Sequence, residues 1–181
     1  MSKSSFENRI IRAAMLDSNL YEEVEADKGA LGQAMAIVVF SSIAAGIGLY
    51  KTGGFSGIIT GTMASLISWY VWAYLTYFIG TKFLPEAQTQ ADLGELLRTI
   101  GFSTSPGLLR VLYFIPGVGV LMFLMASLWM LVAMVIAVRQ ALDYNSTLRA
   151  VGVCVIGYVI QIFVFMIIFS IFGGALPDAP A

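Results

Sequence analysis

The feature that most constrains this chain is the length of its uncharged intervals. After Asp27 the next acidic residue is Glu86, and after Asp143 the only one is Asp178. Charged residues make up 12% of the sequence and hydrophobic residues 59%, with a mean hydropathy of +0.85, whereas about a quarter of the residues of a soluble domain are charged. Apolar stretches of about twenty residues can cross a bilayer as helices. The sequence therefore predicts an all-α, polytopic integral membrane helical bundle.

Four stretches have the length and composition of transmembrane helices, and each is bounded by glycine, proline or a charged residue. They are residues 31–50, 55–80, 116–138 and 148–172.

The two ends of the chain flank a transmembrane domain at residues 31–173. Residues 1–30 form a cytosolic N-terminal segment in which apolar side chains fall near one helical face between residues 5 and 28. We expect a short amphipathic helix that docks on protein or lies on lipid, with a solvated lead-in as the other alternative. Residues 174–181 are expected to form a short flexible tail.

Residues 93–115 are long enough for a fifth span, although Pro106 and Gly107 interrupt them. The positive-inside rule distinguishes a topology in which this segment crosses the membrane from one in which it does not, because Lys and Arg concentrate in cytoplasmic loops. With five spans and a cytoplasmic N-terminus, only Lys51 and Arg110 of the ten basic residues lie outside. Without this crossing, a loop with two arginines moves outside and the asymmetry weakens. We therefore predict five transmembrane helices, the third kinked at Pro106, and a C-terminus on the opposite side from the N-terminus.

The interrupted segment is also the candidate ligand or kink site. Its serine and threonine hydroxyls can satisfy the backbone groups that Pro106 frees in the preceding turn. Arg98 and Arg110 lie about 18 Å apart along a helix, so each can reach an opposite interface by snorkelling. The alternative is a broken helix that lines a substrate, lipid or ion site. The residues concerned are Arg98, Ser103, Thr104, Ser105, Pro106, Gly107 and Arg110.

Small and polar residues in the other spans mark a candidate helix-packing interface. Gly57 and Gly61 have the spacing that lets two helix backbones approach closely, and Ser65 continues their face. Gln161 is expected to find a partner across a helix interface. The aromatic cluster of the second span is expected at the headgroup level, with a ligand box as the alternative. This cluster comprises Trp69, Tyr70, Trp72, Tyr74 and Tyr77.

The sequence lacks the groups that common catalytic sites require. It has no histidine, and its only cysteine, Cys154, lies in an apolar run where a thiol behaves as a small hydrophobe. Disulfides, thiolate metal sites and histidine-based catalysis are thereby excluded. Glu95, three residues before Arg98, is expected to form an ordinary helical ion pair. We expect no enzyme activity, metal, cofactor or nucleic-acid partner.

Several stretches resemble one protein family. They are LYEEVEADKGALGQA before the first span, the Trp-rich second span, GFSTSPGLLRVLYFIPGVG, and AVRQALDYNSTLRAVGV at the last loop. From about Arg9 to Phe172 the chain resembles the bacterial branch of the Yip domain family, which are five-span proteins named after Ypt/Rab-interacting proteins. The resemblance implies five membrane helices and a cytosolic N-terminus, here in a bacterial cytoplasmic (inner) membrane. It assigns no residue a catalytic role.

The resemblance also bears on partners and function. Eukaryotic relatives are implicated in vesicle trafficking through prenylated Rab GTPases, mainly through a longer cytosolic N-terminal region. The shortness of residues 1–30, and Gly101-Phe102 in place of the usual Gly-Tyr pair, argue against a Rab-type GTPase partner. The predicted function is that of a non-enzymatic scaffold, assembly or accessory subunit that associates with itself or with other membrane proteins, among membrane lipids. The alternative is a small transporter, channel or lipid-handling protein that uses the broken third helix.

Overall fold

The computed structural model describes residues 4–48 and 50–172, and every regular element in this part of the chain is helical. This confirms the predicted all-α class. The predicted tail at residues 174–181 lies outside the described residues. In chain order the elements are α1 (Phe6–Ala14), α2 (Ser18–Ala26), the 3-10 helix η1 (Lys28–Ala30), α3 (Leu31–Gly48), α4 (Tyr50–Phe78), the π-helix η2 (Ile79–Phe83), α5 (Leu93–Ser103), the 3-10 helix η3 (Ser105–Phe114), α6 (Gly119–Ala141) and α7 (Thr147–Phe172).

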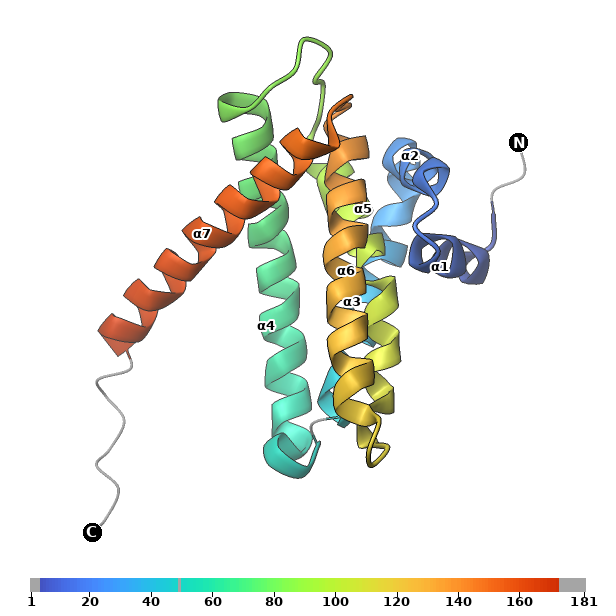
Figure 1. Cartoon of the computed structure of the whole chain (residues 1–181), viewed down its shortest axis with the longest axis vertical. Coiled ribbons are helices and arrows are strands. Elements are labelled where there is room, and N and C mark those ends of the chain that lie inside the picture. The colour runs from blue at the N-terminus through green and yellow to red at the C-terminus, as the bar shows by residue number, and fades with distance from the viewer. Residues whose placement is uncertain (1–3, 49, 173–181) are drawn as a thin grey trace.

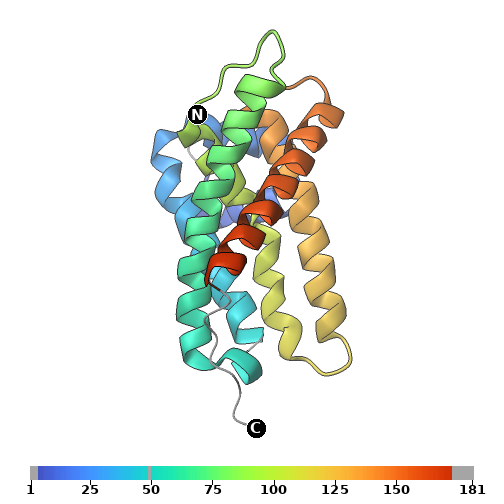
Figure 2. The ribbon, with the colours of Figure 1, turned by 90° about the vertical axis from the view of Figure 1, so that its left-hand side faces the viewer.

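The long helices form a bundle. α3, α4, the α5–η3 segment and α6 run along the long axis of the molecule, and α7 crosses the face between α4 and α6 at an angle (Figures 1 and 2). Four stretches of the described chain are long and apolar enough to cross a membrane, and they coincide with the four clear predicted spans. They are Lys28–Ile47, Gly54–Phe83, Gly119–Ala141 and Thr147–Val164.

The segment predicted as the third span is divided into two helices of different type. α5 ends at Ser103 and η3 begins at Ser105, so neither piece alone has the length of a membrane-crossing helix. Pro106 lies in the first turn of η3, where its missing N–H removes no helical hydrogen bond. The chain therefore changes from α to 3-10 geometry just before Pro106, where the sequence predicted a kink in one continuous helix.

A glycine breaks α4 near its start. Gly54 has φ +59° and ψ −164°, a conformation that residues with a Cβ rarely adopt. The chain can turn sharply there between α3 and the straight part of α4. This position agrees with the predicted start of the second span at residue 55.

The N-terminal segment forms two helices, where the sequence predicted one amphipathic helix. Ser5 caps α1 and Asp17 caps α2, because each side chain accepts a hydrogen bond from a backbone N–H of the first turn. α1 and α2 lie beside one end of the bundle (Figure 1). The buried side chains of Leu20, Tyr21 and Val24 belong to the core, where α2 contacts α5 and α6. α2 therefore packs on the chain's own bundle.

A buried arginine joins the two N-terminal helices. Arg9 is only 2% exposed. Its Nε donates to Glu23 Oε1 at 3.0 Å, its Nη2 to Asp27 Oδ2 at 3.0 Å and its Nη1 to Gln33 Oε1 at 2.9 Å. Arg12 also pairs with Glu23, but its side chain is 26% exposed. Arg9 therefore ties α1 to α2 and to the start of α3.

The α4–α5 and α6–α7 loops meet at one end of the molecule. The Tyr144 hydroxyl donates to the carbonyls of Gly80 at 3.0 Å and Leu84 at 2.7 Å. Glu86 accepts a hydrogen bond from the N–H of Asn145 at 2.9 Å. Because a side chain of α6 also donates to a carboxylate of α2, this end is the one that carries α1 and α2.

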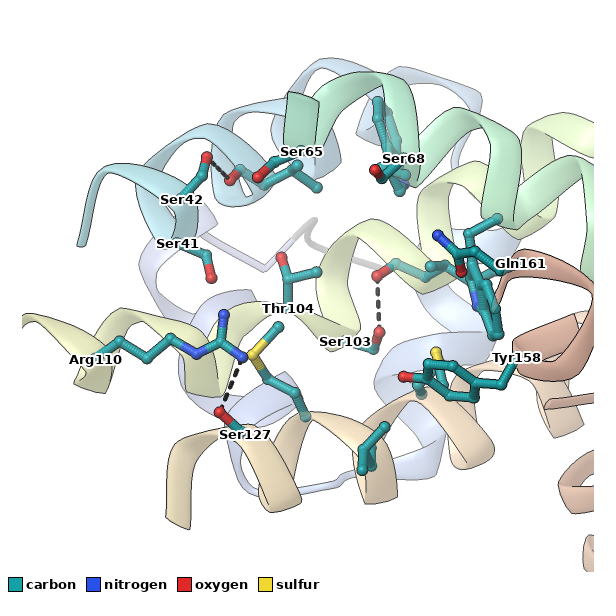
Figure 3. A pocket seen from close by; sticks show the side chains of 17 residues that line it. Ser41, Ser42, Ser65, Ser68, Ser103, Thr104, Arg110, Ser127, Tyr158 and Gln161 are labelled. Atoms are coloured by element: carbon teal, nitrogen blue, oxygen red, sulfur yellow. Dashed lines mark hydrogen bonds between the residues drawn. The ribbon is translucent and has the colours of Figure 1, made fainter. Parts of the chain in front are cut away.

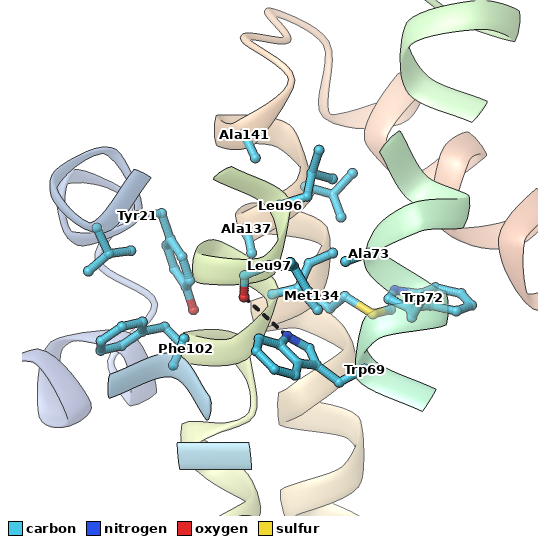
Figure 4. Close-up of a cluster of buried hydrophobic side chains, with 14 of the residues drawn as sticks. Tyr21, Trp69, Trp72, Ala73, Leu96, Leu97, Phe102, Met134, Ala137 and Ala141 are labelled. Carbon is cyan, nitrogen blue, oxygen red and sulfur yellow. Dashed lines mark hydrogen bonds between the residues drawn. The ribbon is translucent and has the colours of Figure 1, made fainter. Parts of the chain in front are cut away.

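The tryptophans of α4 belong to the core, which corrects the predicted headgroup belt. Trp69 and Trp72 are 8% and 6% exposed, and Trp69 Nε1 donates to the carbonyl of Leu97 in α5 at 3.1 Å (Figure 4). Only Tyr70 and Tyr74, on the other side of the helix, are exposed as a belt requires. The headgroup prediction is therefore wrong for both tryptophans.

Glycines permit a close approach of the α5–η3 segment to α3. A Cβ at Gly101 would lie 2.6 Å from the Cβ of Ala34 and 3.2 Å from its backbone, which is closer than atoms pack. A Cβ at Gly107 would collide with the side chain of Ser41. These contacts hold the interrupted segment against α3 in the interior of the bundle.

Candidate functional site

A cavity of about 480 Å³ lies inside the bundle. Every long helix contributes to its wall, and polar side chains from α3, α4, α5, η3, α6 and α7 converge on it (Figure 3). Its described lining contains no acidic residue. The lining residues are Val38, Ser41, Ser42, Ser65, Ser68, Trp69, Trp72, Ile100, Ser103, Thr104, Arg110, Ser127, Met130, Leu131, Met134, Tyr158 and Gln161.

The hydroxyls of the interrupted segment bond to the turn before Pro106. Ser103, Thr104 and Ser105 each donate to the carbonyl three residues earlier, at 2.7 Å in all three cases. These are the hydrogen bonds expected of hydroxyls that satisfy backbone groups ahead of a proline. Ser103 and Thr104 also line the cavity, whereas Ser105, Pro106 and Gly107 are buried outside its lining.

Arg110 turns inward from η3, where snorkelling to the outer interface was predicted. Its Nη2 donates to Ser127 Oγ at 3.1 Å, and its guanidinium carbon lies 5.1 Å from the centre of the Phe123 ring, a cation–π distance. Its Nε is buried without a hydrogen-bond partner. In the described chain every ion pair lies in the N-terminal helices or at the Glu86 loop. Arg110 thus faces the cavity without a carboxylate.

Arg98 has a separate place at the α2 end of the bundle. It is 5% exposed, and its Nε donates to the carbonyls of Val24 at 3.0 Å and Glu25 at 3.1 Å, in the last turn of α2. A cation is favoured at the carbonyl end of a helix. Glu95 forms a capping box with Asp92 at the start of α5. These bonds replace the ion pair that was predicted between Glu95 and Arg98.

The predicted packing residues divide into two groups. Ser65 and Gln161 line the cavity, on α4 and α7 respectively. Gly57 and Gly61 precede Ser65 on α4 and lie on the same helix face. A Cβ added at either glycine would meet no atom within 4 Å. In the described chain, therefore, no helix packs on the glycine pair.

Some cavity residues carried a signal that the sequence interpretation did not use. They are Ser41 and Ser42 of α3, Ser127 of α6 and Tyr158 of α7. Each places a hydroxyl within a predicted span, where polar groups are expensive and usually face the bundle interior. Collecting all hydroxyl residues of the spans would have found them. Only the fold could show that they surround the same space as Arg110.

The site has binding groups but lacks catalytic groupings. No group of three His, Cys, Asp or Glu side chains in the described part of the chain could hold a metal ion. The lining residues offer hydroxyls, an amide, an indole and a guanidinium, without the nearby base that activates a nucleophile. Cys154 is buried in the core, as expected of an apolar thiol. The arrangement can therefore hold a polar ligand by hydrogen bonds and charge.

Long apolar helices around an interior cavity that several polar side chains line define a helical integral membrane protein. The comparison with family profiles adds that the Yip1 domain matches residues 18–169, which is most of the chain. The protein therefore belongs to the Yip1 domain family. Comparisons with curated proteins and with solved structures give no match. The family match confirms the resemblance to the Yip domain family.

Proposed function

We propose that the protein crosses the membrane five times, with the α5–η3 segment as the third crossing. An 11-residue α-helix and a 10-residue 3-10 helix extend about 16 Å and about 20 Å. Together they exceed the roughly 30 Å of a hydrocarbon core. The segment lies between α3 and α6 and leads from the α1–α2 end to the opposite end, where α6 begins (Figures 1 and 2). Such a crossing would retain the predicted topology.

The distribution of basic side chains supports a cytoplasmic location for the α1–α2 end. Arg9, Arg98, Arg139 and Arg149 all bind groups of α2 or of the two loops at this end. The positive-inside rule assigns such an end to the cytoplasm. With five crossings, the C-terminus then lies outside, in what we infer to be a bacterial cytoplasmic membrane.

Within this topology we propose a non-enzymatic role as a scaffold, assembly or accessory subunit that associates with itself or with other membrane proteins. The observation that carries this proposal is the open glycine face of α4. Small residues at four-residue spacing favour close helix pairing, because they let two backbones come into van der Waals contact. Gly57 and Gly61 have no such partner within the described chain. A helix from another subunit would supply it.

Two of the hydroxyls near the glycines do not oppose such pairing. Thr60 Oγ1 donates to the carbonyl of Ser56 at 2.9 Å, and Ser65 Oγ donates to that of Gly61 at 2.8 Å. Their hydroxyl protons are therefore satisfied within α4 and require no water. An approaching helix would therefore not leave these two donors unpaired.

The test is the composition of the particle extracted with its surrounding lipid. We expect the wild-type particle to contain more than one polypeptide chain, either copies of this chain or other proteins. We expect Gly61→Leu to shift the particle toward a single chain. Gly32→Leu is the matched control, since Gly32 on α3 has the same open surroundings and should leave the composition unchanged. A lone wild-type chain, or an unchanged particle for Gly61→Leu, would overturn the proposal.

A further inference from the structure

We propose that the cavity binds the phosphate of a membrane phospholipid headgroup, with Arg110 as the residue that pairs with it. This inference concerns the interior of one chain and does not depend on the association proposed above. Four observations carry it, namely the unpaired charge, the excess of hydrogen-bond donors, the size of the cavity and the side on which it opens.

The first observation is the charge. Arg110 is held in the interior by Ser127 and the Phe123 ring, yet neither neighbour neutralises it. Its Nε has no hydrogen-bond partner, and no carboxylate is found among the described lining residues. An unpaired charge at membrane depth costs several kcal/mol. A bound anion would remove this cost, and arginine pairs with phosphate through two parallel hydrogen bonds.

The second observation is a surplus of donors around the same space. Ser42, Ser65 and Ser127 use their hydroxyl protons on carbonyls of their own helices. In contrast, the hydroxyls of Ser41 and Ser68 have no hydrogen bond in the described chain, although both line the cavity. Figure 3 shows Ser41 on the guanidinium side of the cavity and Ser68 on the wall across from Ser127. A ligand with several acceptor oxygens matches free hydroxyls and a cation better than a neutral solute does.

The indole and amide groups at the α7 side add to the surplus. Trp72 Nε1 is buried without a hydrogen-bond partner, and Gln161 has no hydrogen bond in the part of the chain that the structure describes. Both residues line the cavity. Buried donors without an acceptor are rare in folded proteins. An acceptor-rich ligand in the cavity would pair with the Trp72 indole N–H and with the Gln161 amide.

Size and access favour a lipid as the source of the phosphate. A volume of about 480 Å³ lies in the range of small-molecule sites. Leu131 and Tyr158 line the cavity and are each 40% exposed, so the cavity opens sideways between α6 and α7, toward hydrocarbon. Arg110 is four residues before the end of η3, about 8 Å along a 3-10 helix. A headgroup drawn inward by this distance could reach it while its acyl chains stay in the bilayer.

The test uses the full chain in mixed micelles and counts retained lipids by native mass spectrometry. The probe is phosphatidylglycerol, with diacylglycerol as the phosphate-free control. We expect one retained phosphatidylglycerol, and at least about tenfold weaker retention for Arg110→Gln, since a hydrogen bond to a charged group contributes about that factor. Arg149→Gln is the matched control, because Arg149 lies at the cytoplasmic end with a 42% exposed side chain. It should retain the lipid within about twofold.

A thermal measurement separates ligand binding from a structural role of Arg110. Without lipid, Arg110→Gln should unfold at the same temperature as the wild type or higher, because it removes an unpaired charge. Phosphatidylglycerol should raise the unfolding temperature of the wild type only. If Arg110→Gln fails to fold, the double variant Ser41→Ala with Ser68→Ala serves instead and should weaken lipid retention.

Four outcomes would overturn the proposal. If Arg110→Gln or the double serine variant retained phosphatidylglycerol as well as the wild type does, the residues assigned to the site would not bind the lipid. Equal loss in Arg149→Gln would show only a general charge effect. Equal retention of diacylglycerol would indicate an apolar groove. Stabilisation by inorganic phosphate without any retained lipid would make the ligand a free anion.

Discussion

Replacing Arg9 by methionine should release α1 from the bundle without unfolding the transmembrane helices. Arg9→Met keeps an apolar stem of similar length but removes the guanidinium that donates to Glu23, Asp27 and Gln33. Breaking a buried ion pair costs about 3 to 5 kcal/mol. The two carboxylates are 31% and 15% exposed and can partly hydrate, so the lower value applies. About 3 kcal/mol corresponds to a factor of roughly 150 in the local opening equilibrium.

Hydrogen exchange of the α1 amides measures this opening, with the α6 amides as an internal reference that should not change. Arg12→Met is the matched control. Its partners Asp17 and Glu23 are 30% and 31% exposed and its own side chain is 26% exposed. Water can therefore reach the Arg12 guanidinium, unlike that of Arg9, and the loss should be smaller, about 1 kcal/mol or about fivefold. If both variants accelerated exchange equally, or if Arg9→Met left α1 protected, the conclusion that Arg9 holds α1 against α2 and α3 would be refuted.

Two further predictions concern α2 and α5. Burial, followed by the nearby carboxylates of Asp143, Glu22 and Glu95, raises the pKa of Glu25 from 4.5 to about 8. Because the fold favours the neutral form of Glu25, the contribution of this residue to stability should be fully present below about pH 4.5, fall as the pH rises and be lost above about pH 8. Thermal unfolding should show that Glu25→Gln gains stability at pH 8 but little at pH 5, and parallel pH curves for the two proteins would contradict this. Gly101→Ala should destabilise the α3–α5 contact by about 1 to 3 kcal/mol, because it overpacks a filled interface. The open-glycine variant Gly32→Ala should be near neutral in the same unfolding assay, and equal effects would argue against that contact.

Local patterns in the sequence predicted those parts of the structure that depend on local interactions. Uncharged runs marked the four clear spans, because crossing a bilayer is a matter of length and composition. The hydroxyls of Ser103, Thr104 and Ser105 bond to carbonyls three residues away, so their role follows from neighbours in the chain. Asp17, as a helix N-cap residue, carried a signal for a second N-terminal helix that the single-helix prediction overlooked.

The remaining features depend on contacts between distant segments. α4 is apolar on all sides, so its pattern could not tell which face would meet α5 and bury Trp69 and Trp72. Arg110 has a side chain long enough to reach either the interface or the interior. Its direction depends on Ser127 and Phe123, which α6 supplies from another part of the chain. The candidate cavity could be predicted only as a polar interruption, because its wall combines residues from every span.

The bonds from Arg98 to the last carbonyls of α2 connect the N-terminal helices to the segment that lines the cavity. Arg98 lies on the same short segment that continues into η3 and reaches Arg110 at the cavity. A partner that pulls α2 away from the bundle must break these bonds or displace α5. A displacement of α2 would thus be transmitted along one backbone from α5 into η3.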